Sequence, residues 1–206
     1  MIRRLPSAVL FPLLLGVAAC GSDGGDAAAD TGGADVLADA TAGDAGGDGT
    51  SADTAEEDFG VSLVEAPLWT LAAPEDDPFV ARAPAEPRCV DGAWYVDIDL
   101  IEIDTGKCDY ATLVQPLAAD LAPGDEVEII AWNGRLAAPE VAMAHIDVRI
   151  GDALVWGEEV PIPSEGGFYT PRLAVTAAAP AGTPVYFHVD NHGFNTWNLV
   201  KISRFR

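Results

Sequence analysis

The chain has 206 residues, with 33 acidic and 11 basic side chains and a formal net charge of −22. Residues 59–206 contain 22 of the acids and 9 of the bases, which leaves a net charge of −13 there. This charge argues against nucleic acid, anionic lipid and phosphate-rich polymers as partners. The same region is long enough for one domain with its own hydrophobic core.

Residues 1–19 have the three parts of an export signal. Arg3 and Arg4 precede an apolar run over 5–17, and two alanines come directly before Cys20. The run is shorter than the about 20 apolar residues that a membrane-spanning helix needs. The pattern therefore predicts a leader for export rather than a membrane span.

The sequence Val17-Ala18-Ala19-Cys20 resembles the lipobox of bacterial lipoproteins. The resemblance implies a mature chain that begins at Cys20 and carries acyl chains, such as palmitate, on its thiol and amino group. Several acyl chains anchor a protein stably where one does not. A lipid-anchored protein of the bacterial cell envelope follows, and Gly21 in place of aspartate favours the outer membrane. An ordinary secretory signal with an incidental cysteine is the alternative.

Residues 20–58 are expected to be a lipidated cysteine followed by a disordered acidic tether. Between 21 and 58 there are 11 acidic residues and no lysine or arginine, and Val36 and Leu37 are the only large apolar residues. Such a segment cannot bury enough apolar surface to offset the entropy lost on ordering. A calcium-binding acidic repeat is the alternative, but the aspartate spacing is irregular and contains no EF-hand loop.

Residues 59–87 contain five prolines and predict a segment that wraps the surface or adds an edge strand. Residues 88–206 predict an all-β domain, because apolar and polar residues alternate with a period of two in several segments. The expected strands are 94–104, 126–132, 144–150, 153–160, 172–177, 184–190 and 196–203.

Turn signals separate these strands, and Gly151-Asp152 is the signal of a two-residue hairpin. Seven or eight short strands at this spacing predict an antiparallel β-sandwich of the jelly-roll type. The fold class expected from the sequence is therefore a β-sandwich behind a disordered N-terminal tether.

The order of the turn and strand signals resembles a galactose-binding-like jelly roll, the fold of many carbohydrate-binding modules. The matching segments are 122–125 before a strand that ends in tryptophan, the hairpin at 151–152, the turn and strand at 180–189, and 191–197. The resemblance covers residues 88–206 and implies a fold rather than a ligand. The chain also resembles uncharacterised lipoproteins of δ-proteobacterial type, which implies no known activity.

Cys89 and Cys108 are the other two cysteines, and an exported protein folds in an oxidising compartment. A disulfide between them is the simplest account. Two free thiols are the alternative, and a metal site is disfavoured because neither cysteine belongs to a Cys-x-x-Cys pair.

Alternation places polar and aromatic residues of three strands on the side opposite the core. If these strands are neighbours, they form one face able to stack on a sugar or peptide and to fix its orientation by hydrogen bonds. A solvated outer face without a ligand is the alternative. The candidate ligand-binding residues are Trp132, His145, Tyr186, His188 and Asp190.

The sequence leaves the metal content unknown and requires no cofactor. His188 and His192 are about 13 Å apart if the strand is extended, so they do not share one ion there. A structural calcium ion is possible, since loop carboxylates suit it, but no spacing selects among the candidates. These are Asp91, Asp104, Asp109 and Asp125.

Motifs of catalysis are absent: there is no Gly-x-Ser-x-Gly, no His-Glu-x-x-His and no glycine-rich phosphate loop. The sequence therefore predicts a non-catalytic, membrane-anchored binding module for carbohydrate or an envelope partner. A structural envelope lipoprotein that docks on a protein partner is the alternative, and a hydrolase is a distant third.

Overall fold

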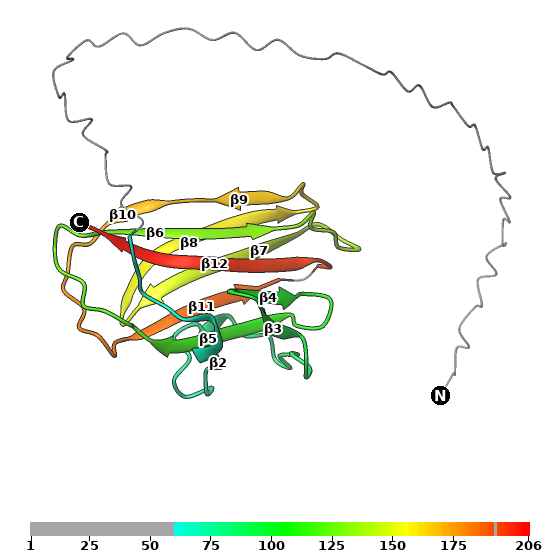
Figure 1. Cartoon of the computed structure of the whole chain (residues 1–206). Helices are drawn as coiled ribbons and strands as arrows, with labels where there is room; N and C mark the ends of the chain where they lie inside the picture. The colour runs from blue at the N-terminus through cyan, green and yellow to red at the C-terminus, as the bar shows by residue number, and fades with distance from the viewer. Residues whose placement is uncertain (1–59, 192) are drawn as a thin grey trace, which may run out of the picture. The chain divides into compact units, whose positions relative to one another are not determined.

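The computed structural model describes residues 60–191 and 193–206, which form an antiparallel β-sandwich of the jelly-roll type (Figure 1). The expected leader, Cys20, the tether and His192 lie outside the described residues. Within the described part of the chain, no helix is long and apolar enough to cross a membrane.

Sheet A has seven strands on the path β10-β6-β12-β4-β3, with β1 also beside β12 and β9 beside β6. All of its pairs are antiparallel. Its strands are β1 (Val61–Ser62), β3 (Trp94–Asp97), β4 (Leu100–Asp104), β6 (Glu126–Asn133), β9 (Gly167–Tyr169), β10 (Arg172–Ala174) and β12 (Thr196–Phe205).

Sheet B has five strands in the order β2-β5-β11-β7-β8. Two short 3-10 helices, η1 (Ala66–Leu68) and η2 (Val80–Arg82), flank its edge strand β2 in the chain. Its strands are β2 (Thr70–Leu71), β5 (Tyr110–Pro116), β7 (Ala142–Ile150), β8 (Ala153–Ile162) and β11 (Pro184–Asp190).

The core lies between the sheets and is built from the apolar side of each alternating strand. On β11, for example, Val185, Phe187 and Val189 are all buried. Each such side chain contributes about 1.5–3 kcal/mol by leaving water. The ring of Trp197, which is fully buried, stacks on Tyr169 at a centroid distance of 6.1 Å.

The segment 94–104 is a hairpin, and its prediction as a single strand is wrong. β3 and β4 pair with each other around a turn at Ile98 and Asp99. The pattern did not reveal the turn because Ile98 and Leu100 are apolar and continue the alternation of the preceding strand. In the structure Ile98 is 88% exposed in the turn, and the core side of β4 is that of Ile101 and Ile103.

Two further strands, β5 and β10, differ from the predicted strands because of how they pack. β5 was not predicted, because it is buried on both faces and five of its first six residues are buried without alternation. β10 ends at Ala174 rather than at 177, because Val175 begins a loop that bonds to Asp125 instead of to β6.

Candidate binding site

Trp132 does not share a face with the other four predicted site residues. It lies on β6 in sheet A, whereas His145 is on β7, and Tyr186, His188 and Asp190 are on β11, both in sheet B. The condition that these three strands are neighbours holds for β7 and β11 but not for β6. Alternation of apolar and polar residues indicates on which side of a strand a residue lies, but not to which sheet the strand belongs.

Trp132 belongs to a row of five side chains that crosses the outer face of sheet A. Each member is the direct cross-strand partner of the next, from β3 through β4, β12 and β6 to β9. Their chain neighbours Ile101, Ala131 and Leu199 are buried in the core, so the row points outward. The members of this aromatic row are, in order, Tyr95, Glu102, Asn198, Trp132 and Phe168.

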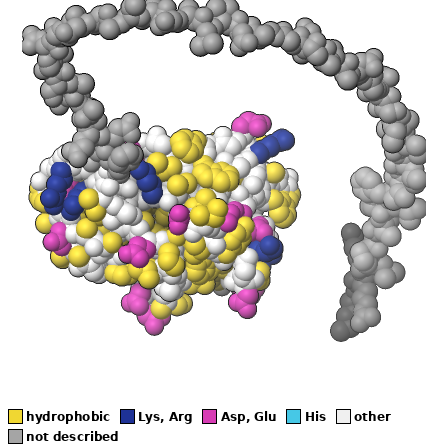
Figure 2. Space-filling view, in the orientation of Figure 1, with side chains coloured by type: hydrophobic (Ala, Val, Ile, Leu, Met, Phe, Trp, Pro, Cys, Tyr) yellow, Lys and Arg dark blue, Asp and Glu magenta, His cyan; other side chains and the backbone are white. Residues whose placement is uncertain are grey.

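The aromatic members of the row are accessible. Phe168 is 68% exposed, Tyr95 is 43% exposed and Trp132 is half-buried. Adjacent strands lie about 4.8 Å apart, so Tyr95 and Trp132 are separated by about 14 Å across three strand spacings. Figure 2 shows hydrophobic side chains gathered on the face seen in that view, with Asp and Glu side chains among them.

The middle of the row is polar. Asn198 is fully buried although its strand position faces outward, and its Oδ1 has no hydrogen-bond partner among the described residues. Tyr95 is hydrogen-bonded to Glu102, and this bond raises the pKa of Tyr95 above its ordinary value. A buried acceptor without a partner is uncommon in native structures. The row therefore combines exposed rings at its ends with a polar, partly buried middle.

A pocket of about 400 Å³ opens where sheet A has a gap beside this row. β4 pairs with β12 as far as Leu199, β1 pairs with it from Ser203 onward, and a β-bulge at Val200 lies between them. The floor of the pocket is apolar, because Trp69 and Ile101 are buried there. Bulges frequently adjoin functional sites.

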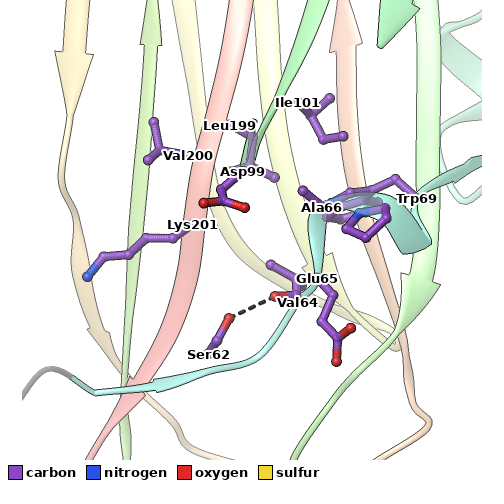
Figure 3. A pocket seen from close by; sticks show the side chains of 11 residues that line it. Ser62, Val64, Glu65, Ala66, Trp69, Asp99, Ile101, Leu199, Val200 and Lys201 are labelled. Carbon is purple, nitrogen blue, oxygen red and sulfur yellow. Dashed lines mark hydrogen bonds between the residues drawn. The ribbon is translucent and has the colours of Figure 1, made fainter. Parts of the chain in front are cut away.

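The rim of this pocket carries two carboxylates and one ammonium group. In Figure 3 the carboxylates of Glu65 and Asp99 do not point toward one another, and Lys201 extends away from the pocket. Lys201 Nζ lies 3.1 Å from Glu128 Oε2. Since the carboxylates of Glu65 and Asp99 do not face each other, the rim does not present the carboxyl pair that glycoside hydrolysis uses. The turn before Asp99 holds Ile98 at a φ of 55°, a left-handed conformation that is rare for a β-branched residue.

On sheet B, the structure brings the other predicted residues together on the outer face. His145 pairs with Asp190 across β7 and β11, and its Nδ1 lies 2.5 Å from Asp190 Oδ1. His188 Nε2 lies 3.4 Å from Asp190 Oδ2. Tyr186 lies on the same side of β11 and is half-buried.

Residues 72–88, here called the strap, cover this face. Phe79 of the strap stacks on His188, with ring centroids 4.3 Å apart and an interplanar angle of 14°. Asp77 accepts hydrogen bonds from the hydroxyls of Tyr110 (2.6 Å) and Thr112 (2.9 Å), which anchors the strap to β5. His188 is left with no exposed surface.

Arg82 fixes the strap to the two strands beyond β5. Its Nε lies 3.1 Å from Asp190 Oδ2, and its Nη2 pairs with Asp147 on β7. Both carboxylates are less than 10% exposed, and buried charges persist only when they are paired. The face expected to be open to a ligand is therefore filled by the chain itself.

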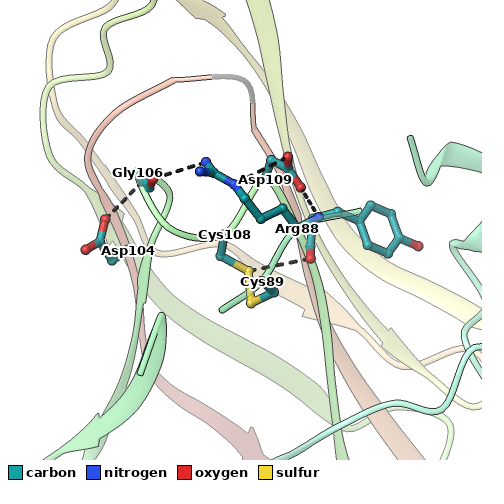
Figure 4. The surroundings of a disulfide bond; sticks show 7 residues. Arg88, Cys89, Asp104, Gly106, Cys108 and Asp109 are labelled. Carbon is teal, nitrogen blue, oxygen red and sulfur yellow. Dashed lines mark hydrogen bonds and ion pairs between the residues drawn. A yellow bond between two sulfur atoms is a disulfide. The ribbon is translucent and has the colours of Figure 1, made fainter. Parts of the chain in front are cut away.

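The disulfide between Cys89 and Cys108 is confirmed, and it closes the strap onto the start of β5. Figure 4 shows the bonds around it. The Arg88 N–H donates to Asp109 Oδ1 at 2.7 Å, and the Arg88 guanidinium donates to the carbonyl of Gly106 at 3.1 Å. The strap is thus held at both ends and in the middle.

Sequence reasoning missed Asp77, Phe79 and Arg82 as partners of the predicted site. The strap has no strand or helix periodicity that would give its side chains a direction. The signal that was present is one phenylalanine and two arginines in a short proline-rich segment.

Burial and charge set the ionisation of the covered network. Burial lowers the pKa of His188 below its ordinary value, although the neighbouring Asp190 opposes this. Burial alone would raise the pKa of Asp190, but hydrogen bonds from the two histidines and the charges of His145 and Arg82 lower it. Burial also raises the pKa of Tyr110, as does its hydrogen bond to Asp77.

The carboxylates considered for calcium are scattered. Asp104 accepts from Gly106 N–H and pairs with Lys107, and Asp125 accepts from Ala122 N–H at 2.9 Å. Asp109 is bonded to the strap, and Asp91 is exposed. Over residues 60–191 and 193–206, no group of three or more His, Cys, Asp or Glu is placed to hold a metal ion.

No family model matches the chain, and no curated protein is significantly similar to it. Solved structures are similar to it at the level of the fold. A carbohydrate-binding module of family 4 has a TM-score of 0.40 and 11% identity over 66% of this chain and 86% of that chain.

Two other carbohydrate-binding proteins are similar at the same level. A family 61 module in complex with β-1,4-galactotriose has a TM-score of 0.37 and 10% identity, over 70% of this chain and 98% of that chain. The second N-terminal cellulose-binding domain of a Cellulomonas fimi β-1,4-glucanase has a TM-score of 0.35 and 16% identity, over 72% and 95%. With TM-scores below 0.5, these likenesses do not extend to a ligand or to site residues.

The covered histidine makes the stability of the fold depend on pH. Because the pKa of His188 is lower in the folded than in the unfolded chain, the unfolded chain binds more protons below about pH 6.5. The contribution of neutral His188 to the free energy of unfolding is therefore fully present above that pH. It is lost as the pH falls toward the pKa of His188 in the folded chain. We expect urea denaturation midpoints to fall between pH 7.5 and 5.5, and His188→Gln to flatten this slope. An unchanged slope in the variant would contradict the assignment.

Removing the disulfide is expected to destabilise the domain by about 3 kcal/mol, because a loop of this length loses entropy in the unfolded state when it is closed. The double change Cys89→Ala and Cys108→Ala, followed by urea denaturation, measures the loss. The parent chain in a reductant should show the same decrease. A double variant as stable as the oxidised parent would mean that the hydrogen bonds of Arg88 and Asp109 alone fix this end of the strap.

Proposed function

We propose that the β-sandwich is a non-catalytic binding module that takes carbohydrate on the outer face of sheet A. The aromatic row is the observation that carries the proposal, because it places three rings and two polar side chains in one line across five strands. The outer face of sheet B is already covered by the strap.

The chemistry of the row suits a sugar chain. Aromatic rings pack on the apolar faces of pyranose rings, while a few polar groups fix the orientation of the ligand. Phe168 and Tyr95 offer exposed rings near the two ends, and Trp132 lies directly beside Phe168. Glu102, the cross-strand partner of Tyr95, supplies carboxylate acceptors for hydroxyl donors between them.

The charge of the domain narrows the choice of carbohydrate. A net charge of −13 over residues 59–206 repels sulfated, phosphorylated or uronic-acid polymers. Glu102 lies within the row itself. The proposed ligands are therefore neutral glycans.

Binding to neutral glycans should be lost when the rings of the row are removed. We expect Trp132→Ala and Phe168→Ala each to weaken binding about tenfold or more, since a truncated aromatic anchor costs more than 1 kcal/mol. Isothermal titration with soluble β-1,4-linked glucan and galactan oligosaccharides measures the affinity. Phe194→Ala is the matched control, because Phe194 is 64% exposed and outside the row.

Equal affinities for Phe168→Ala and Phe194→Ala would place the glycan elsewhere on the molecule. An absence of binding to every neutral glycan would overturn the carbohydrate proposal. It would favour the alternative in which the same exposed rings dock on a protein of the envelope.

We also propose that the module is held at the bacterial outer membrane by lipid on Cys20. The motif that supports this is Val17-Ala18-Ala19-Cys20 after a short apolar run. Incorporation of an alkyne-labelled fatty acid in the producing cell is expected for the parent chain and absent in Cys20→Ser. Label retained in Cys20→Ser would exclude this anchor, and sucrose-gradient separation of the labelled membranes identifies which membrane holds it.

A further inference from the structure

The pocket in the gap of sheet A opens on the same face as the aromatic row. On β12, Lys201 and Ser203 flank the fully buried Ile202, so both take the outward side of the strand. Ser62 is the cross-strand partner of Ser203, and both Ser62 and Lys201 line the pocket. The mouth of the pocket is therefore on the outer face of sheet A, and its floor reaches the core at Ile101.

The pocket lies directly beside the middle of the row. On β12, the lining residue Val200 comes two residues after Asn198, and on β4, the lining residue Ile101 directly precedes Glu102. Two residues of an extended strand span about 7 Å. A ligand chain that follows the row therefore passes the mouth of the pocket within reach of one short side group.

The middle of the row is also the part that lacks an aromatic ring. Its rings lie at Tyr95 on one side and at Trp132 and Phe168 on the other, with Glu102 and Asn198 between them. A glycan held only by the rings would have no apolar contact in this stretch. The pocket supplies one, because its floor is apolar.

Hydrogen bonds to both sheets fix the wall of the pocket opposite β4, which is the segment between β1 and β2. Leu63 N–H donates to the carbonyl of Ile202 in sheet A at 2.9 Å. Glu65 N–H donates to Gln115 Oε1 of sheet B, also at 2.9 Å. The wall is held from two sides, so the pocket is formed before a ligand enters it.

The lining of the pocket suits a sugar ring, because its floor is apolar and its rim is polar. Trp69 and Ile101 are buried at the floor, whereas Glu65 and Asp99 are exposed at the rim (Figure 3). A pyranose ring has apolar C–H faces and a set of hydroxyl donors, which match these two parts. The volume of about 400 Å³ lies within the range of pockets that bind small ligands.

The charges at the rim favour a neutral sugar over an acidic one. The carboxylates of Glu65 and Asp99 repel a uronic acid or a phosphate, but they accept hydrogen bonds from neutral hydroxyls. Hydrogen bonds to an ionised acceptor are stronger than those between neutral groups. Lys201 does not reverse this preference, because its ammonium group pairs with Glu128.

We propose that this pocket takes a single-sugar branch of a neutral glycan whose backbone lies along the aromatic row. The inference rests on the proposed function, since the row holds the backbone, and it narrows the ligand to branched neutral glycans. The branch enters the gap between β4 and β1, and its hydroxyls donate to the carboxylates of the rim.

Matched pairs of glycans test the branch with the full chain. Isothermal titration compares a β-1,4-glucan oligosaccharide with the same backbone carrying single xylose branches. A second pair is a β-1,4-mannan oligosaccharide without and with single galactose branches. In at least one pair, the branched glycan is expected to bind the parent chain about tenfold more tightly. Trp132→Ala should weaken both members of that pair, because it removes a ring that holds the backbone.

Filling the pocket should remove only the preference for the branched glycan. Ala66 lines the pocket and is half-buried, so the larger side chain of Ala66→Leu takes up space that the branch needs. This variant is expected to bind both members of the pair equally and to keep the parent's affinity for the unbranched one. Ala178→Leu is the matched control, because Ala178 is exposed and does not line this pocket.

A second variant keeps the test available if Ala66→Leu does not fold. Glu65→Ala removes an exposed carboxylate of the rim and retains the backbone hydrogen bond of this residue. It is expected to reduce the preference for the branched glycan by about threefold to tenfold. Glu140→Ala is its control, since Glu140 is exposed and outside the pocket.

The outcomes separate the branch from the row. Equal affinities within both pairs, or a preference kept in folded Ala66→Leu and in Glu65→Ala, would overturn the branch and leave the row as the binding site. No binding of any of the four glycans would overturn the branch as well, and titrations with the other neutral glycans then decide the carbohydrate proposal. Added butylammonium should leave the preference unchanged, whereas its loss would assign the pocket to a cation instead.

Discussion

The paired contact of Arg82 with Asp147 and Asp190 is the constraint on which the arrangement of this domain depends. Two carboxylates that are nearly fully buried would be costly without that guanidinium, and it reaches them only when the strap lies across sheet B. The same position brings Phe79 onto His188 and Asp77 onto β5. The outer face of β5 and β11 and part of that of β7 are therefore covered, and the polar residues there act as an internal network.

Because the strap covers the outer face of sheet B and leaves that of sheet A open, the two sheets have different roles. In sheet B, the polar outer face stabilises the fold by satisfying its own charges and hydroxyls. In sheet A, the aromatic row stays exposed, and the gap between β4 and β1 admits a pocket beside it. Trp132 is held on β6, which is paired on both sides, whereas Tyr95 and Phe168 are held on β3 and β9, each paired on one side. A ligand would meet this surface with little rearrangement.

The pocket of sheet A occurs where the regular pairing of β12 is interrupted by one extra residue. Val200 interrupts β12 beside the gap in sheet A. A bulge bends its strand and locally opens the ladder, so side chains that would meet in a regular sheet are separated. The polar rim of this pocket then follows from which residues the sequence places there.

The sequence by itself determined the strands in which apolar and polar residues alternate, together with the disulfide. β6, β7, β8, β11 and β12 follow the alternation that predicts them, and their inward residues, such as Ile129 and Phe187, are those expected for the core. Alternation is local, because it records which side of a strand meets water. Tertiary structure decided the rest. β5 does not alternate because the strap covers its outer face. Trp132 lies beside Asn198 and Phe168 rather than His188, because the order of strands in a sheet depends on contacts between residues distant in the chain. The strap itself has no period, so only its ion pairs and ring contacts in the folded chain place it.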